Sequence, residues 1–153
     1  MKLSDFLSPE TIESSLQARN GAEALAELAG LLFRAGHVPE DTDLVQILKN
    51  REELGSTGLG DGVAIPHVYL KSLSAPRVAV GRSVEGVDFN AIDGRPVHIF
   101  FLLVTPDISK GDHLKMLARI SRLLRKPDLR RSLMGAAGSE EMQRIILEED
   151  EEE

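Results

Sequence analysis

The spacing of apolar and polar residues changes twice along the chain and divides it into three parts. Between residues 8 and 55, apolar residues recur every three or four positions, as they do on one face of an α-helix. In the middle part the segments are shorter and rich in β-branched residues, which is typical of strands. From about residue 111 onward the helical spacing returns. The pattern therefore predicts helices, then strands, then helices.

The predicted helices of the first part have recognisable ends. Ser8 is a good N-cap and Pro9 suits the first helical position, which favours a short helix from this point. Gly36 and Gly55 each follow a periodic segment, as glycine does after the C-terminus of a helix. The three helices predicted here cover residues 8–18, 21–36 and 41–55.

The middle part contains the most apolar segment of the chain. Residues 97–105, VHIFFLLVT, are apolar at both alternating sets of positions, as expected of a central strand covered on both sides. Helices flank the strands on either side in sequence, so the fold class is predicted as α/β, with helices on both faces of the sheet. Two further strands are predicted at residues 62–66 and 77–84, and C-terminal helices at residues 112–126, 127–136 and 139–149.

Composition narrows the class of protein. The chain has 153 residues, 42% of them hydrophobic, which suits one domain with its own core rather than a disordered chain. It contains no cysteine, which excludes disulfides and thiol chemistry. Its apolar runs are too short to cross a bilayer as a helix. We therefore expect a soluble, cytoplasmic protein that is not embedded in a membrane.

The negative charge is concentrated at the C-terminus. The net charge is −7, but residues 148–153, EEDEEE, carry six acidic groups, and the remainder of the chain is nearly neutral. We expect a domain over residues 1–147 followed by a frayed, solvated acidic tail over residues 148–153. The chain lacks the basic excess of a nucleic-acid-binding protein, so nucleic acid is not an expected partner.

The segment STGLGDGVAIPHVYL, residues 56–70, carries the leading candidate for chemistry. A glycine-rich loop runs into a short apolar strand that stops at Pro66 and His67. Pro66 fixes the backbone and so aims the imidazole of His67, and ligands of open α/β sheets lie at strand ends. The loop can bring backbone N–H groups of Gly58, Gly60 and Gly62 close to an anion. Its hydroxyl donors are Ser56 and Thr57.

Two more residues extend this candidate site. His113 falls in the first turn of a predicted helix, where the helix N-terminus disfavours imidazolium and keeps the ring neutral. It also lines up with Leu117 at helical spacing, so it is alternatively the polar end of a buried stripe. Arg51 precedes the loop and is either a surface cation or the counter-charge for a phosphate. Together with His67, these residues could accept and stabilise a phosphoryl group.

Other histidine chemistry is less well supported by the sequence. His37 follows Gly36 and is predicted to be a solvated turn residue. His98 lies at the start of the central strand and is expected to have a structural role. A metal held by His67 and His113 would need a third ligand at a motif spacing, and the sequence offers none. We therefore expect neither a metal nor a cofactor.

Four segments of the chain resemble one known family. They are NREELGSTGLGDGVAIPHVYL at residues 50–70, LSDFLSPETI at 3–12, FNAIDGRPVHIFFLLVTP at 89–106 and GDHLKMLARISRLL at 111–124. They resemble the enzyme IIA domains of the bacterial phosphoenolpyruvate-dependent phosphotransferase system, in the fructose/mannitol class and its nitrogen-regulatory, PtsN-like branch. The likeness covers almost the whole chain.

This resemblance implies a fold and a function. The family fold is a mixed five-stranded sheet flanked by helices. His67 would accept a phosphoryl group from the phosphocarrier HPr or its nitrogen-branch counterpart, and His113 would orient that group beside Arg51. Acting as a phosphotransferase, the protein would pass the group to a IIB domain or hold it as a signal.

The sequence leaves three roles open. The protein could be a regulatory phosphotransfer protein, a IIA component for a separately encoded fructose/mannitol-type permease, or a binding module that no longer accepts phosphate. The chain as given contains no IIB or membrane segment, which favours regulation. Val68 and Tyr69 follow His67 where many family members carry a small and then a basic residue, so apolar and aromatic surface is expected where partners approach. Lys115 occupies a position where nitrogen-branch members often have another histidine.

Overall fold

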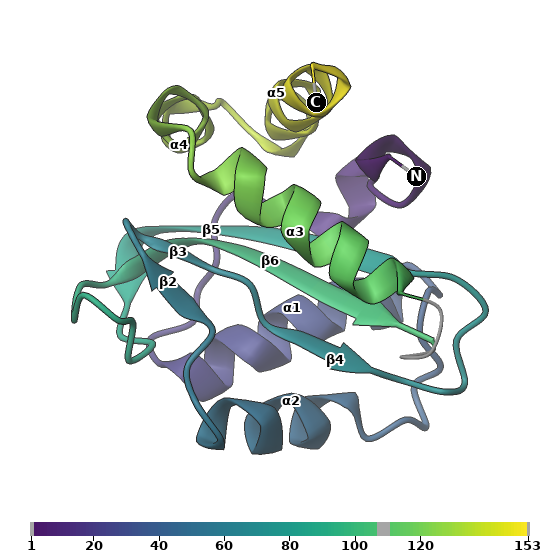
Figure 1. The fold of residues 1–153 in the computed structure, drawn as a ribbon. Coiled ribbons are helices and arrows are strands. Elements are labelled where there is room, and N and C mark those ends of the chain that lie inside the picture. Colours follow the sequence, from purple (N-terminus) through teal and green to yellow (C-terminus); the bar gives the residue numbers. More distant parts are fainter. Residues whose placement is uncertain (1, 107–110, 153) are drawn as a thin grey trace.

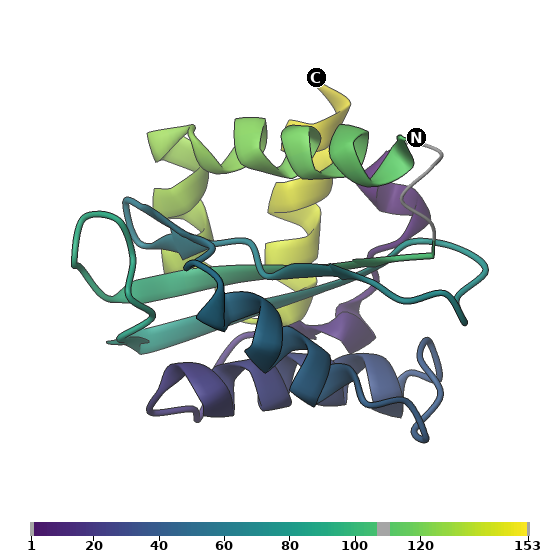
Figure 2. The same ribbon diagram turned by 60° about the horizontal axis from the view of Figure 1, so that its bottom comes forward.

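The protein folds into three layers, with a sheet between two groups of helices. The computed structural model describes residues 2–106 and 111–152. α1 and α2 cover one face of the sheet, and α3, α4 and α5 cover the other (Figure 1). Seen nearly along the sheet, the two helical layers lie clearly on opposite sides of it (Figure 2). The expected α/β fold class with helices on both faces is confirmed.

The elements follow one another along the chain in a fixed order. They are η1 (Leu3–Asp5), η2 (Pro9–Thr11), β1 (Ile12–Glu13), α1 (Gly21–Arg34), α2 (Leu44–Glu53), β2 (Gly58–Gly60), β3 (Val63–Ala64), β4 (His67–Tyr69), β5 (Arg77–Val87), β6 (Val97–Thr105), α3 (Asp112–Leu124), α4 (Pro127–Gly135) and α5 (Ser139–Glu151).

The sheet is mixed and is built around β6. Its strand order is β1-β5-β6-β3-β2, and β4 pairs with β6 beyond the end of β3. β3 and β4 both run parallel to β6, at Ile99 and Phe100 for β3 and from Leu103 onward for β4. The two residues between them, Ile65 and Pro66, interrupt what is otherwise one row. The structure therefore has six strands in five rows, where five strands were expected.

The alternating side chains of β6 enter two separate cores. Phe100, Leu102 and Val104 pack with α1 and α2, while Phe101 and Leu103 pack with α3, α4 and α5. All five are fully buried, so this strand contributes apolar side chains to both layers. The prediction of a central strand covered on both sides is confirmed.

The helix predicted over residues 8–18 is wrong. Ser8 and Pro9 do start a helical turn, but it is a single 3₁₀ turn that ends at Thr11. The next residue, Ile12, pairs in parallel with Val80 of β5. A β-branched residue beside an available strand edge gains a ladder and a core position here, and this long-range contact overrides the local helix start signal.

The acidic C-terminus also differs from the expected frayed tail. α5 continues to Glu151, and the carboxylate of Asp150 is buried, with 1% of the residue exposed. Asp150 accepts a hydrogen bond from the backbone N–H of Leu3 at 2.8 Å and from the guanidinium of Arg119. Residues 148–151 are thus part of the folded domain, and residue 153 lies outside the described residues. Within the described part of the chain, no helix is long and apolar enough to cross a membrane.

Candidate active site

His67 is the first residue of β4, directly after the interruption at Ile65 and Pro66. Its Nδ1 lies 2.7 Å from the carbonyl oxygen of Ile65. A carbonyl can only accept, so Nδ1 carries the proton and donates it. The lone pair of the neutral ring is then on Nε2. The sequence expectation placed His67 at the end of a strand, whereas the structure places it at the start of the next one.

The backbone that holds His67 is itself anchored to α2. The carboxylate of Glu52 accepts hydrogen bonds from the backbone N–H of Thr57, at 3.0 Å, and from the Thr57 hydroxyl. The Thr57 carbonyl accepts from the N–H of Ile65 at 3.1 Å. Ile65 in turn accepts from His67. This chain of contacts fixes the position of the imidazole relative to the C-terminus of α2.

His113, in the first turn of α3, is buried, and 2% of it is exposed. Its Nδ1 is hydrogen-bonded to the hydroxyl of Thr105, the last residue of β6. Burial, and to a smaller extent the charge of His67, lowers the pKa of His113 to about 4. The ring is therefore neutral at neutral pH, as expected, but burial is the main cause rather than the helix N-terminus. Its Nε2 is buried and has no partner among the described residues.

The two histidines line one groove of about 410 Å³ between α2, β4 and α3. Their ring centroids are 5.4 Å apart, with planes tilted by 52°. The ring of Tyr69 packs against His113 at 4.2 Å. Arg51 lines the same groove from α2. The structure therefore brings together His67, His113 and Arg51, as the sequence led us to expect.

Arg51 has one guanidinium contact that is described. Its Nη1 donates to the carbonyl oxygen of Gly55 at 2.9 Å, just beyond the end of α2. A guanidinium has five N–H donors, so one backbone contact leaves donors for an anion in the groove. Arg51 thus lines the groove with donors that remain available, and its role as a counter-charge stays a prediction.

The glycine-rich loop does not surround His67. The carbonyl of Gly62 accepts from the N–H groups of His98 and Ile99, whereas His67 pairs with Leu103. Ile99 and Leu103 are four residues apart along β6, which places the contacts of Gly62 and His67 roughly 13 Å from each other. At Gly60, φ is +93° and an added Cβ would lie 3.3 Å from the carboxylate of Asp93. This turn packs against Asp93, whose carboxylate accepts a hydrogen bond from the N–H of Asp61 at 3.0 Å.

The remaining loop residues that were predicted to bind phosphate have structural contacts. The Ser56 hydroxyl donates to the carbonyl of Phe89 at 2.6 Å and accepts from the N–H of Gly58 at 3.0 Å. A Cβ on Gly58 would lie 2.9 Å from Ala91, so glycine is needed there for close packing. Thr57 is buried and bonded to Glu52. The phosphate cradle expected from this loop is thus not formed around His67.

The other two histidines lie outside the groove. His98 contacts the carbonyl of Ser83 through Nδ1 at 2.8 Å, in agreement with a structural role. His37 is half-buried rather than solvated, and burial together with the nearby Arg77 lowers its pKa. The described residues contain no group of three or more His, Asp or Glu placed to hold a metal ion.

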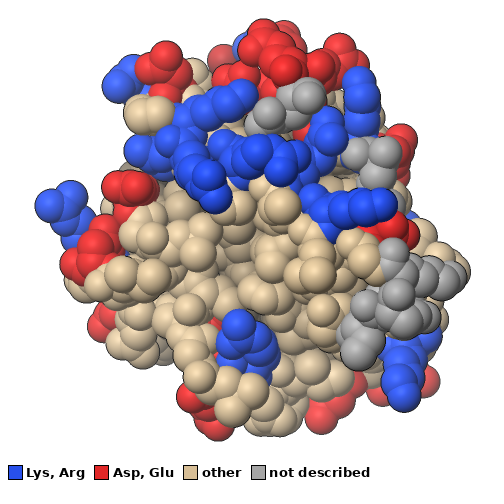
Figure 3. All heavy atoms as spheres, viewed as in Figure 1, with Lys and Arg blue, Asp and Glu red and all other residues tan. Residues whose placement is uncertain are grey.

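The surface around the groove is apolar with a basic border. Leu54, Tyr69 and Leu114 line the groove and are 86%, 42% and 66% exposed. Val68 also lines the groove but is buried, and it packs into the core formed with α1 and α2. Figure 3 shows Lys and Arg side chains gathered over α3, beside uncharged surface over the sheet. Of the two predicted contact residues after His67, only Tyr69 is exposed.

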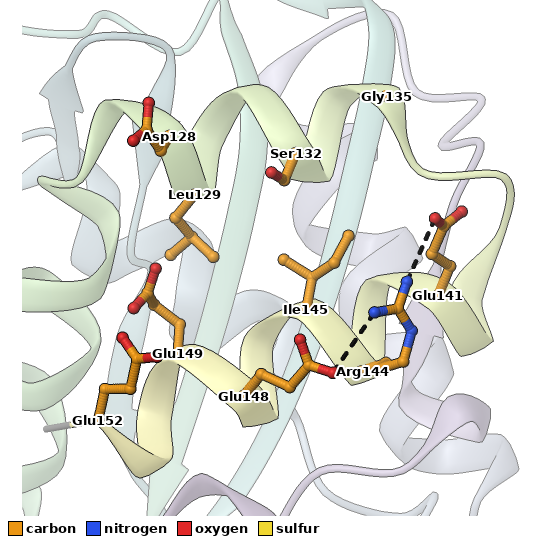
Figure 4. A pocket seen from close by; sticks show the side chains of 10 residues that line it. All are labelled: Asp128, Leu129, Ser132, Gly135, Glu141, Arg144, Ile145, Glu148, Glu149 and Glu152. Atoms are coloured by element: carbon orange, nitrogen blue, oxygen red, sulfur yellow. Dashed lines mark hydrogen bonds and ion pairs between the residues drawn. The ribbon is translucent and has the colours of Figure 1, made fainter.

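A second groove, of about 480 Å³, lies between α4 and α5 and differs in character (Figure 4). Arg144 is paired there with Glu141 and Glu148, each at 3.4 Å, and further carboxylates line the walls. It contains no histidine, so it offers no nucleophile of the kind found beside β4.

Two contacts at the site escaped the sequence reading. One is the hydrogen bond between Thr105 and His113. The only indication of it in the sequence is that a polar residue, Thr105, ends the apolar segment of the central strand. Glu52 holds Thr57, and its signal was an acid five residues before a threonine at the mouth of the loop. Both partnerships need the tertiary fold to be recognised.

Comparison with known proteins identifies the class of protein that has this fold. Residues 5–149 match the family described as phosphoenolpyruvate-dependent sugar phosphotransferase system, EIIA 2. The chain belongs to this family.

Among its relatives, two kinds of protein are represented. A nitrogen regulatory protein from Bradyrhizobium diazoefficiens is 35% identical over 148 residues, which are 95% of each chain. A fructose-specific EIIABC component from Bacillus subtilis is 32% identical over 150 residues, and the present chain spans only 24% of its length. The crystal structure of the nitrogen regulatory protein IIA-Ntr from Neisseria meningitidis superposes with a TM-score of 0.86 at 33% identity, covering 94% of this chain and 98% of that one.

Proposed function

We propose that this protein carries a phosphoryl group on Nε2 of His67 and that its phosphorylation state has a regulatory output. The observation that carries the proposal is the hydrogen bond from His67 Nδ1 to the carbonyl of Ile65, because it directs the lone pair of Nε2 into the groove with His113 and Arg51. The whole-length likeness to nitrogen regulatory proteins supports the regulatory part.

The transfer step exchanges one P–N bond for another. Nε2 of His67 attacks the phosphorus of a donor phosphohistidine whose other ring nitrogen carries a proton, and the new P–N bond forms as the old one breaks. The donor then leaves as a neutral imidazole, and the Nδ1 proton of His67 stays on the phosphorylated ring. Because the two bonds are alike, the protein has to supply position and charge stabilisation rather than bond energy. The fixed Nδ1–H makes Nε2 available without a separate proton transfer.

Three features of the groove would stabilise the transferred group. Arg51 offers guanidinium donors from α2, and such charge-assisted contacts are the strong ones for phosphate oxygens. His113 offers a buried Nε2 in the same groove, with no hydrogen-bond partner in the described part of the chain. The apolar walls around Leu54 and Tyr69 exclude water when a partner covers them, which strengthens both interactions.

The donor that fits this chemistry is a histidine phosphocarrier of the HPr type, or its nitrogen-branch counterpart. The exposed apolar residues around His67 would suit a carrier with an apolar contact surface, and the basic residues over α3 would favour acidic groups at its edge (Figure 3). A IIB domain or a regulatory target would then bind the same face after phosphorylation.

Intact-mass spectrometry tests the transfer. The protein is incubated with phosphoenolpyruvate, enzyme I and HPr, and the modified residue is mapped at neutral pH. We expect a gain of one acid-labile phosphoryl group on His67, complete loss of labelling in His67→Ala, and unchanged labelling in the control His37→Gln. Labelling of folded His67→Ala at the wild-type level would refute the assignment.

The regulatory output needs a separate experiment. Proteins retained by immobilised His67→Asp, which places a negative charge at this position, are compared with those retained by His67→Ala. We expect different partner sets, because a charge in an apolar groove changes the free energy of docking. Identical sets would argue against regulation by charge and leave transfer to a sugar permease as the function.

A further inference from the structure

Thr105 lies directly beneath the second histidine and is held there by the sheet. It is the last residue of β6, pairs with Tyr69 of β4, and is 1% exposed. Its carbonyl accepts a hydrogen bond from the N–H of Leu70 at 2.8 Å, which fixes the backbone. Its hydroxyl faces Nδ1 of His113. The hydroxyl can reorient its proton, while the fixed backbone and the burial of the side chain restrain the position of the oxygen.

The imidazole of His113 is correspondingly restrained. A neutral imidazole has one N–H donor and one acceptor nitrogen, and the partner of one nitrogen decides the role of the other. Here Nδ1 meets Thr105, while Nε2 is buried without a partner among the described residues. Tyr69 packs against the ring at 4.2 Å, so the ring is also held from the groove side.

Phosphoryl oxygens are acceptors at neutral pH, so His113 can stabilise them only through an N–H. Nε2 is the nitrogen that lacks a protein partner, and His67 is the neighbouring ring in the groove. A proton on Nδ1 would leave the Nε2 lone pair facing the phosphoryl oxygens. A proton on Nε2 gives a directed donor instead, and this requires Nδ1 to accept.

We propose that Thr105 is a positioning residue: its hydroxyl donates to Nδ1 of His113 and so holds the His113 proton on Nε2, where it is donated to the phosphoryl group on His67. This inference rests on the proposed function, since it assigns a role within the same site. In this arrangement the two histidines have opposite tautomers. His67 keeps its proton on Nδ1, where a carbonyl accepts it, and His113 keeps its proton on Nε2, where a hydroxyl donates to the other nitrogen.

Nitrogen NMR of the unphosphorylated protein tests the tautomers directly. The ring nitrogens of His113 are assigned in wild type, Thr105→Val and Thr105→Ser. We expect wild type and Thr105→Ser to show an unprotonated Nδ1 and a protonated Nε2, and Thr105→Val to show a mixture. A protonated Nδ1 in wild type would overturn the proposal, as would identical spectra for wild type and Thr105→Val.

The transfer rate supplies the functional readout. Loss of one oriented hydrogen bond predicts roughly tenfold slower phosphorylation of Thr105→Val by the carrier, with Thr105→Ser restored to near the wild-type rate. Thr11→Val, which removes the hydroxyl of another fully buried threonine far from the groove, controls for packing. We expect it to transfer at the wild-type rate, and thermal melts confirm that each variant is folded.

The two readouts separate this inference from the function on which it rests. If wild type gains no phosphoryl group, the proposed function fails, while the NMR spectra still decide the tautomer. If wild type is phosphorylated and Thr105→Val is equally fast, the positioning role of Thr105 fails and the carrier function stands.

Discussion

Replacing Asp150 by alanine tests whether the acidic end of the chain is part of the folded structure. The Asp150 carboxylate is buried and accepts from the Leu3 N–H and from Arg119, and the Arg119 Nη2 also donates to the Asp150 carbonyl at 2.9 Å. The substitution leaves the Leu3 N–H and the Nε of Arg119 without their acceptor, while the Arg119 Nη2 keeps the backbone carbonyl of residue 150. Residues 3, 119 and 150 come from the N-terminus, α3 and α5, so three segments lose a shared contact.

The magnitude follows from the burial of the two partners. Removing one member of a fully buried ion pair costs about 3–5 kcal/mol because the other charge is left uncompensated. The Arg119 side chain is 18% exposed, so water recovers part of this loss. We therefore expect Asp150→Ala to lower the free energy of unfolding by about 2–4 kcal/mol. Truncation after residue 147 removes the same carboxylate and should cost at least as much.

Urea denaturation followed by circular dichroism measures this loss. Glu148→Ala is the matched control, because this neighbouring acid in α5 is 66% exposed and pairs only at the surface with Arg144 at 3.4 Å. Such exposed pairs contribute about 0–1 kcal/mol, so the control should be nearly neutral. Equal, small effects of Asp150→Ala and Glu148→Ala would refute the reasoning and would mean that the end of α5 is frayed in solution.

Two further predictions concern the groove and its support. Because burial lowers the pKa of folded His113 to about 4 from an ordinary 6.5, the unfolded state binds a proton first as the pH falls. Protonation of the unfolded state therefore destabilises the fold by up to about 3 kcal/mol between pH 6.5 and pH 4, and not above pH 6.5. Urea denaturation at several pH values in this range should show that the free energy of unfolding falls less steeply with falling pH in His113→Gln than in wild type, and parallel pH dependences would contradict the assignment. Glu52→Ala leaves the buried N–H of Thr57 unpaired and should cost about 1–3 kcal/mol in the same assay, against almost nothing for the exposed neighbour in Glu53→Ala.

The sequence predicted best those elements whose signals are local. α1 and α2 end before Gly36 and Gly55 as their caps indicated, and the run from residue 97 to 105 is the central strand. These features depend on residues within a few positions of each other. The failure at residues 8–18 arose because Ile12 forms a ladder with a strand almost seventy residues later, which no local pattern records.

The candidate site likewise contains residues that the sequence identified and contacts that are recognisable only in the folded protein. His67, His113 and Arg51 were recognised because a family motif carries them, and the fold brings them into one groove. The glycine loop was misjudged because glycines that allow a tight turn and close packing resemble glycines that bind an anion. The contacts of Gly58 with Ala91 and of Gly60 with Asp93 distinguish the two cases only in the folded protein.

Active sites often use the same residues to set the protonation of a histidine and to contact a partner. At the break between β3 and β4, different groups serve these two purposes. At this break the backbone of Ile65 leaves the ladder of the sheet, and its carbonyl sets the tautomer of His67. The tautomer of His67 is therefore set by main-chain atoms, which side-chain substitutions elsewhere in the groove leave in place. The exposed side chains around it, such as Leu54, Tyr69 and Leu114, can be exchanged to suit a different carrier or target without retuning the imidazole.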